Sequence, residues 1–248
     1  MKKQLLRSYA RLIVRRGANV QPDQRVVITA AVDQHAFVTL VMEECYAAGA
    51  RSVRVDWSCD AHTLLHYRYR SLEDLSMVTD ERKARLQAEV EELPAQIHIV
   101  SDDPNGLDGI DREKMMKARQ ASWGIIKPYR DAMENRYQWV IAAVPSKAWA
   151  RKVFPSLSPA KAVEALWEAI LASCRVTEGG DALAAWAEHD AAFVSRCRWL
   201  NEHHFDTVTY QSSNGTDFRA GLISEGQWCG GGEETIGGVY FDPNIPTE

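Results

Sequence analysis

Residues 25–57, RVVITAAVDQHAFVTLVMEECYAAGARSVRVDW, hold the pattern that decides the fold. Arg25–Thr29 is a short run rich in β-branched residues, which indicates a buried strand, and Ser52–Trp57 indicates a second strand. Between them an apolar face recurs at helical spacing, with Asp33 as the expected N-cap and Gly49 as the stop. The members of this face are Phe37, Leu40, Val41, Cys45 and Ala48. The stretch therefore predicts two parallel strands joined by a right-handed helical crossover.

The same alternation extends outward in both directions. A leading helix carries Leu5 to Ile13 on one face, and a polar helix is expected from Thr79 to Glu92. Two more strand patterns follow at Gln96–Val100 and Trp139–Val144. Strands that alternate with helices predict an α/β fold, with an open, mainly parallel sheet and helices on both faces, over about residues 1–145.

The secondary-structure pattern of the sequence then changes twice. A helical region is expected over about residues 146–205, with Ser158 and Pro159 at the start of one helix. Together with the sheet it makes an N-terminal α/β domain of residues 1–205. In residues 206–248, short β-prone runs surround Asn214-Gly215, a strong hairpin turn signal. We interpret 206–248 as the beginning of a second, β-rich domain that is cut short.

Composition narrows the possible partners and location. The formal net charge is -5, which disfavours binding to a phosphate backbone because such binding needs concentrated Lys and Arg. The sequence contains no run of about 18 or more apolar residues, which is the length that a membrane-spanning helix needs. The five cysteines include no CxxC pair, a pattern typical of reduced thiols in the cytosol. We therefore expect a cytoplasmic protein with no nucleic-acid and no membrane partner.

The seven histidines do not form a known metal motif. His62 and His66 are four residues apart, but no Glu follows the first one as in HExxH. His203 and His204 are adjacent near an expected helix end, where a cationic ring can meet the last carbonyl groups. His189 shares a helix with Trp186 and is expected to be packed or hydrogen-bonded. Structural roles are the favoured interpretation, with metal binding as the alternative.

Other motifs of catalysis and binding are missing as well. The acidic stretch from Asp102 to Gly106 lacks the ligand spacing of an EF-hand and indicates a turn. No GxGxxG follows the first strand, and there is no phosphate loop or GxSxG elbow. From its residues alone the chain holds no complete catalytic site. A module that binds a nucleotide or small ligand at the carboxyl ends of its strands, or a dimerisation domain, remains an alternative.

Four longer segments occur in order along the chain as YARLIVRRGANVQPDQ (9–24), YAAGARSVRVDW (46–57), WARKVFP (149–155) and FDPNIPTE (241–248). Together they resemble the aminopeptidase T and aminopeptidase S family of metallopeptidases. The last is the most specific, because it is similar to a PNIPTEE stretch at the start of the family's catalytic domain. The resemblance covers essentially the whole chain.

This resemblance implies a cytoplasmic, homodimeric enzyme that removes N-terminal residues from peptide substrates with two divalent metal ions (Co, Zn, Mn or Mg). Two such ions can bridge a water and polarise the scissile carbonyl. The resemblance also implies that the metal ligands begin with Glu248 or the residue after it. The catalytic residues and the other ligands would follow in a part beyond this chain. We therefore expect a front part that is inactive alone and binds no metal stably.

Overall fold

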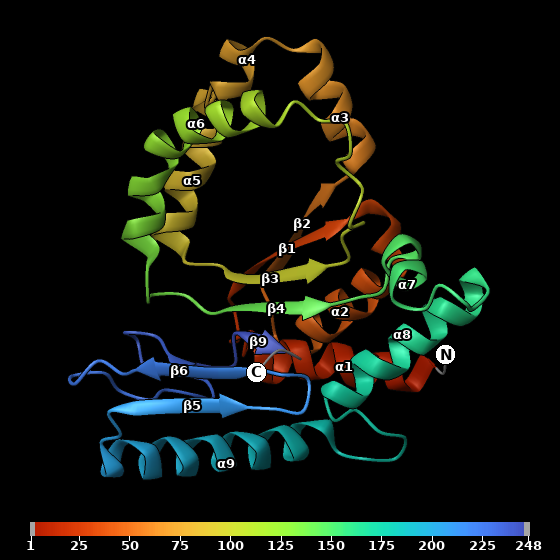
Figure 1. Cartoon of the computed structure of the whole chain (residues 1–248). Coiled ribbons are helices and arrows are strands. Elements are labelled where there is room, and N and C mark those ends of the chain that lie inside the picture. Colours follow the sequence, from red (N-terminus) through yellow and green to blue (C-terminus); the bar gives the residue numbers. More distant parts are fainter. Residues whose placement is uncertain (1–2, 246–248) are drawn as a thin grey trace.

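The computed structural model describes residues 3–245, and its centre is a five-stranded sheet in the order β2-β1-β3-β4-β9 (Figure 1). All neighbouring strands in this sheet are parallel. The strands are β1 (Arg25–Ala31), β2 (Ser52–Ser58), β3 (Ala95–Val100), β4 (Trp139–Ala143) and β9 (Asn244–Ile245). The open parallel sheet predicted from residues 25–57 is thus confirmed.

Helices connect these strands and lie on both sides of the sheet (Figure 1). The first group is α1 (Lys3–Leu12), its π-helical continuation η1 (Ile13–Gly17), the 3-10 turn η2 (Val32–Gln34) and α2 (His35–Ala47). The second group forms an arch of α3 (Asp60–Tyr69), α4 (Leu72–Ser76), α5 (Asp80–Glu92) and α6 (Arg112–Met133). The third group is α7 (Lys147–Val153), α8 (Pro159–Ser173) and α9 (Ala182–His203).

Two short hairpin-like pairs complete the described chain. β5 (Thr207–Gln211) pairs antiparallel with β6 (Asp217–Gly221) across Asn214 and Gly215. Gly215 has φ +93°, which glycine adopts without steric cost. β7 (Glu233–Glu234) pairs antiparallel with β8 (Tyr240–Phe241). The hairpin predicted at Asn214-Gly215 is confirmed.

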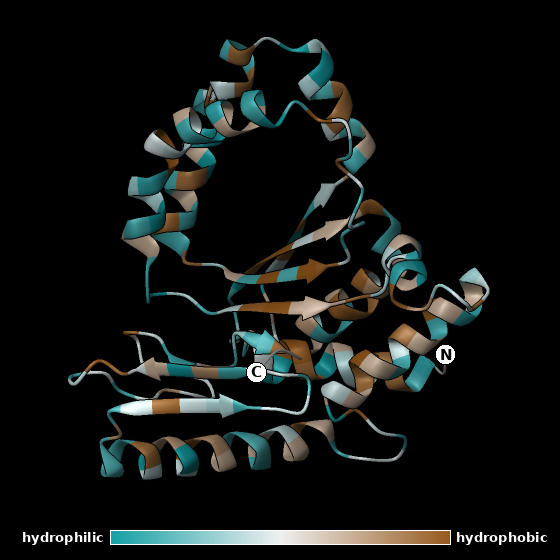
Figure 2. Cartoon of the chain, viewed as in Figure 1, coloured by the Kyte–Doolittle hydropathy of each residue, from teal (hydrophilic) through white to brown (hydrophobic). Residues whose placement is uncertain are grey.

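The main core fills the space between one face of the sheet and helices α1, α2 and α8. Alternate residues of β3, namely Ala95, Ile97 and Ile99, face this core. Figure 2 shows the apolar residues concentrated on the central strands and on the helices beneath them. Tyr9 of α1 lies fully buried here, and its hydroxyl donates to the Ala143 carbonyl at 3.0 Å. This face of the sheet is closely packed.

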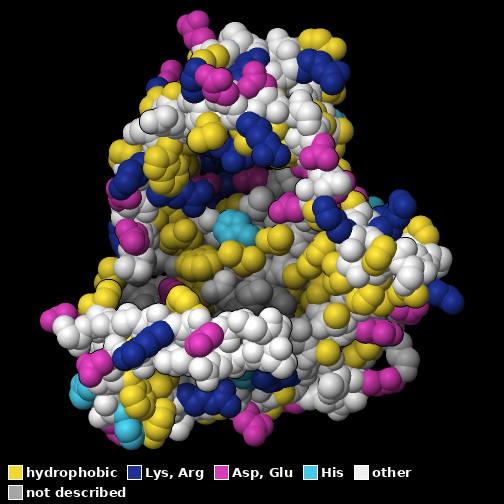
Figure 3. All heavy atoms as spheres, in the orientation of Figure 1, with side chains coloured by type: hydrophobic (Ala, Val, Ile, Leu, Met, Phe, Trp, Pro, Cys, Tyr) yellow, Lys and Arg dark blue, Asp and Glu magenta, His cyan; other side chains and the backbone are white. Residues whose placement is uncertain are grey.

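The other face of the sheet is covered differently. It meets the arch through polar contacts, since Arg54 of β2 pairs with Glu89 of α5 at 2.5 Å and Arg130 of α6 donates to Gln96 at 3.3 Å. The arch has its own small apolar core, made of Val78, Leu86 and Ile126. Below the arch the molecule is hollowed, with hydrophobic, charged and histidine side chains on the walls (Figure 3). β3 contributes the half-buried His98 to this open face.

Local signals were read correctly at some helix starts and wrongly at one. The helix expected from Thr79 to Glu92 is confirmed as α5, and the Thr79 hydroxyl caps it by accepting from the Arg82 amide at 3.3 Å. The expected cap at Asp33 is wrong. β1 continues to Ala31, and the 3-10 turn η2 uses Asp33 before α2 begins at His35.

The last described residues belong to the main sheet and not to a separate β-rich unit. β9 pairs in parallel with β4, with Ile141 opposite Asn244 and Ala142 opposite Ile245. Residues 244–245 therefore complete the first sheet, although β5 and β6 form a separate pair. The domain boundary at residue 206 stays a prediction, and β9 links the two parts that it separates.

Gly17, at the end of η1, makes the closest approach to this new edge of the sheet. A Cβ atom at Gly17 would lie 2.8 Å from Val140 Cγ2 and 3.3 Å from Ile245 Cδ1. Val140 and Ile245 are both fully buried, so neither side chain can move into solvent. The absence of a side chain at residue 17 lets η1 lie directly against β4 and β9.

Replacing Gly17 by Ala is expected to destabilise the chain by about 1–3 kcal/mol, because the added methyl group overpacks a closed core. Gly124 is the matched control, since nothing lies within 4 Å of its hypothetical Cβ in α6. Gly124→Ala should stabilise by about 0.5–1 kcal/mol through the lower entropy of the unfolded chain. Urea denaturation of both variants measures the difference. Equal stabilities of the two variants would contradict the packing of η1 on β9.

Candidate functional site

Glu248, the metal ligand implied by the sequence, lies outside the described residues, but the segment that leads to it is described. Asp242 sits between β8 and β9, and its amide donates to the carbonyl groups of Arg16 (3.2 Å) and Gly17 (3.0 Å). The Ile141 amide donates to the Pro243 carbonyl at 2.7 Å. Backbone hydrogen bonds thus fix residues 242–245 between η1 and β4.

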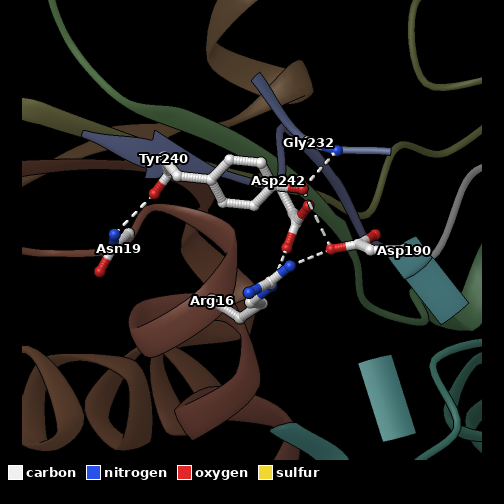
Figure 4. Close-up of polar contacts among 6 residues, drawn as sticks. All are labelled: Arg16, Asn19, Asp190, Gly232, Tyr240 and Asp242. Atoms are coloured by element: carbon white, nitrogen blue, oxygen red, sulfur yellow. Dashed lines mark hydrogen bonds and ion pairs between the residues drawn. The ribbon is translucent and has the colours of Figure 1, made fainter. Parts of the chain in front are cut away.

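Side chains hold the same segment through a buried cluster around one arginine (Figure 4). Arg16 donates through Nε to Asp242 Oδ2 and through Nη2 to Asp190 Oδ2. Its guanidinium also lies over the Tyr240 ring, 4.8 Å from the ring centre. We call Arg16, Asp190, Tyr240 and Asp242 the Arg16 cluster. It joins η1, α9 and the β8–β9 segment.

Tyr240 completes the hydrogen bonding of the Arg16 cluster. Its hydroxyl donates to Asp190 Oδ2 at 3.2 Å and accepts from the Gly232 amide at 2.9 Å. Its carbonyl accepts from Asn19 Nδ2 at 2.6 Å. A Cβ at Gly232 would lie 2.3 Å from Tyr240 Cζ and 2.5 Å from Asp242 Oδ1. Only glycine fits at this point, so the 230–232 loop can close over the cluster.

Burial changes the acid–base behaviour of the Arg16 cluster. The side chains of Asp190 and Asp242 are only 6% and 3% exposed. Burial raises the pKa of Asp242 to about 7, with Arg16 opposing the rise and Asp190 adding to it. Burial, and then the two carboxylates, raise the pKa of Tyr240 to about 12. Burial alone would lower the pKa of Arg16, but its bonds to both carboxylates raise it overall.

The structure does not bring the histidines noted in the sequence together. His62 and His66 lie exposed on α3. His189 packs between Trp186 and Phe193, with ring centroids 5.3 and 4.6 Å away. Near the end of α9, His203 Nδ1 lies 2.7 Å from the Trp199 carbonyl, and His204 follows in the left-handed conformation.

No group of three or more His, Cys, Asp or Glu side chains within residues 3–245 could hold a metal ion. The carboxylates of the Arg16 cluster are turned to an arginine, which occupies the place a cation would take. The described residues therefore do not fit the metal pair that the family resemblance implies, and no catalytic step is assigned to them.

The carboxyl ends of the strands carry an acidic edge. Asp33, Asp60, Asp102 and Asp103 follow β1, β2 and β3, and burial together with the other three raises the pKa of Asp60. The stretch from Asp102 to Gly106 is a turn, in which Asp103 Oδ1 accepts from the Asn105 amide at 2.9 Å. The negative charge gathered at this edge would repel the phosphates of a nucleotide.

Sequence reasoning missed the members of the Arg16 cluster. Arg16 lies within the segment 9–24 that supports the family resemblance, but the sequence assigned it no role. Asp190 did carry a signal, because Ala182, Trp186 and Asp190 recur every four residues and form the buried stripe of α9. An aspartate in a buried stripe indicates an ionic partner. Nothing in the sequence indicated that this partner lies 174 residues earlier.

Comparison with known proteins identifies the class of protein. Residues 2–248 match the family described as thermophilic metalloprotease (M29). The match spans nearly the whole chain, and the chain belongs to this family. None of the helices in residues 3–245 has the length and apolar character needed to cross a membrane.

Within the family, named aminopeptidases are similar to this chain. Aminopeptidase PepS of Streptococcus thermophilus is 34% identical over 248 residues, which cover 99% of this chain and 60% of the relative. Aminopeptidase AmpS of Bacillus subtilis (strain 168) is also 34% identical, over 251 residues. The solved structure of wild-type AmpT from Thermus thermophilus matches with a TM-score of 0.86 at 30% identity. It is covered to 60% and this chain to 99%, so the chain spans about 60% of the length of these relatives.

Replacing Arg16 by Ala is expected to cost about 3–5 kcal/mol near neutral pH, because two buried carboxylates lose their cation. The cost should shrink in acid, where Asp242, whose pKa burial raises to about 7, takes up a proton. Arg11→Ala is the matched control, since Arg11 is exposed on the same helical stretch. Chemical denaturation at two pH values measures both variants. A loss as small as that of Arg11→Ala would show that the cluster does not hold the segment.

Proposed function

We propose that this chain is the N-terminal part of a metal-dependent aminopeptidase, an enzyme that removes N-terminal residues from peptides. The proposal rests on the family match and on the named relatives, all aminopeptidases, of which the chain spans about 60%. The single observation that carries it is the position of residues 240–245. The segment that precedes the implied ligand Glu248 is held by β4 and by the Arg16 cluster.

The role of the described residues in such an enzyme would be to position and to enclose. β9 holds residues 244–245, which precede the implied ligand Glu248, along the edge of the sheet. The hollowed surface below the arch (Figure 3) would line one side of the space that a peptide enters. Val100 and Ile141, each 38% exposed, contribute apolar surface to this side. Two divalent ions, a homodimer and a cytoplasmic location belong to the proposal as expectations.

The alternative of a nucleotide-binding module has less support. A doubly wound sheet binds such ligands at the carboxyl ends of its strands. Here that edge carries four aspartates, and no glycine-rich phosphate loop follows β1. The expectation of an enzyme part explains the family match, which a separate binding module does not.

A paired aminopeptidase assay tests the proposal, with a chromogenic leucine substrate and added cobalt. One sample is the 248-residue chain, and the other is the product of the same gene read past Glu248. We expect cleavage only by the longer protein. Cleavage by the 248-residue chain would place the metal ligands within it, and His62, His66, His203 and His204 would be the first to replace. Failure of both proteins to cleave would overturn the proposal.

A substitution in the longer protein tests the implied ligand. Glu248→Gln removes a carboxylate that would bind the metal, so we expect activity to fall by at least about 100-fold. Replacing a residue that only hydrogen bonds to a metal ligand typically lowers activity by about 10–100-fold. Glu225→Gln is the control, because Glu225 is exposed on the loop after β6. Full activity of the Glu248 variant would assign the ligand to a different residue.

A further inference from the structure

The Arg16 cluster contains an imbalance of charge that its hydrogen bonds leave unresolved. One guanidinium faces two carboxylates, and both carboxylates are almost fully buried. Arg16 binds the Oδ2 atom of each, while neither Asp190 Oδ1 nor Asp242 Oδ1 has a hydrogen-bond partner among the described residues. A buried net charge of minus one with two unpartnered oxygens is costly.

A single proton removes both costs. Both carboxyl groups bind the same guanidinium, Asp242 at Nε and Asp190 at Nη2, and Asp190 adds to the raised pKa of Asp242. Two carboxylates in one buried site do not both ionise readily, as the aspartic-protease pair illustrates. A proton on the pair leaves one negative charge to balance Arg16 and gives the pair a donor.

The groups around the pair do not offer another way to balance it. From η1 comes Arg16 alone, and from β8 comes Tyr240, whose raised pKa keeps its phenol a neutral donor. From α9 comes His189, next to Asp190, and burial lowers the pKa of this histidine. Its ring is packed against Trp186 and Phe193. Within residues 3–245, a proton is therefore the remaining source of positive charge for the pair.

The environment also keeps water away from the pair. The 230–232 loop lies so close that a Cβ at Gly232 would be 2.5 Å from Asp242 Oδ1. On the other side, the amide of Asp242 is bonded to the carbonyls of residues 16 and 17. Opening of the 240–245 segment would expose both carboxyl groups together.

We propose that Asp190 and Asp242 share one proton, and that this proton locks residues 240–245 onto η1. The two carboxyl groups would then act as positioning residues for the segment that leads to Glu248, a role that rests on the proposed function. Loss of the proton to solvent leaves two charges against one arginine and loosens the segment. The lock would thus be tight in mild acid and would weaken as the pH rises toward about 7.

Linkage gives the size and sign of the effect. The pKa of Asp242 lies at about 7 in the folded chain, above its ordinary value of 3.8, so closing the segment takes up a proton between these values. The resulting stability is fully present below about pH 4 and is lost as the pH rises through about 7. The opening equilibrium should therefore rise roughly 50-fold from about pH 5 to about pH 7, and only about two-fold more by about pH 8.

Hydrogen–deuterium exchange of the 248-residue chain tests this without any catalytic assay. After correction for the intrinsic exchange rate, peptides covering residues 240–245 should lose protection roughly 50-fold from about pH 5 to about pH 7, and only about two-fold more by about pH 8. Asp242→Asn mimics the protonated form and should flatten the profile, whereas Glu188→Gln, an exposed carboxylate on α9, should leave it unchanged. The proposal would be overturned if protection of residues 240–245 in the original sequence did not change with pH. It would also be overturned if Asp242→Asn showed the same pH dependence as the original sequence.

A second measurement covers the case in which Asp242→Asn does not fold. The infrared C=O stretching band of a protonated carboxyl, shifted by isotope labelling of aspartate, should be present in the unaltered chain at about pH 5 and lost above about pH 8. Absence of this band in mild acid would overturn the shared proton. Neither experiment depends on aminopeptidase activity, so failure here is distinct from failure of the proposed function.

Discussion

Residues 16 and 17 join the last described strand to the first helix. Gly17 has no side chain, and this allows η1 to lie against Val140 and Ile245. Arg16 beside it reaches two carboxylates, one on α9 and one just before β9. The fifth strand of the sheet, the position of α9 and the path of residues 240–245 all depend on this contact.

Packing and ion pairing serve different purposes at this contact. The apolar approach of Gly17, Val140 and Ile245 supplies stability, because it buries surface without polar cost. The ion pairs supply less, since taking charges out of water offsets much of their attraction. Their geometry is directional, however, and fixes how far the segment runs along β4. We interpret Arg16 as setting register and the surrounding apolar residues as setting stability.

The sequence was sufficient for the parts of the fold that depend on local pattern. The strand patterns of β1 and β2 and the apolar face of α2 between them predicted a parallel sheet, because two strands joined by a helix of this length form a crossover connection. The same reasoning could not find β9, since Asn244–Ile245 is two residues long and has no periodicity of its own. The Arg16 cluster could not be predicted from the sequence either, because its members lie up to 226 residues apart and no local rule pairs them. The local signal for Asp190 is its four-residue spacing from Trp186, which puts it on the buried face of α9, where an aspartate needs a partner.

The parallel pairing of β4 with β9 has a consequence for synthesis of the chain. Roughly 100 residues separate Ala143 from Asn244, so β4 is made long before its neighbour. At typical ribosomal speeds the nascent chain carries the bare edge of β4 for roughly 5–20 s. An unpaired strand edge is a template for pairing with other chains. During this interval the helical segments from α7 to α9 emerge next, and the risk of aggregation falls on the edge that β9 finally covers.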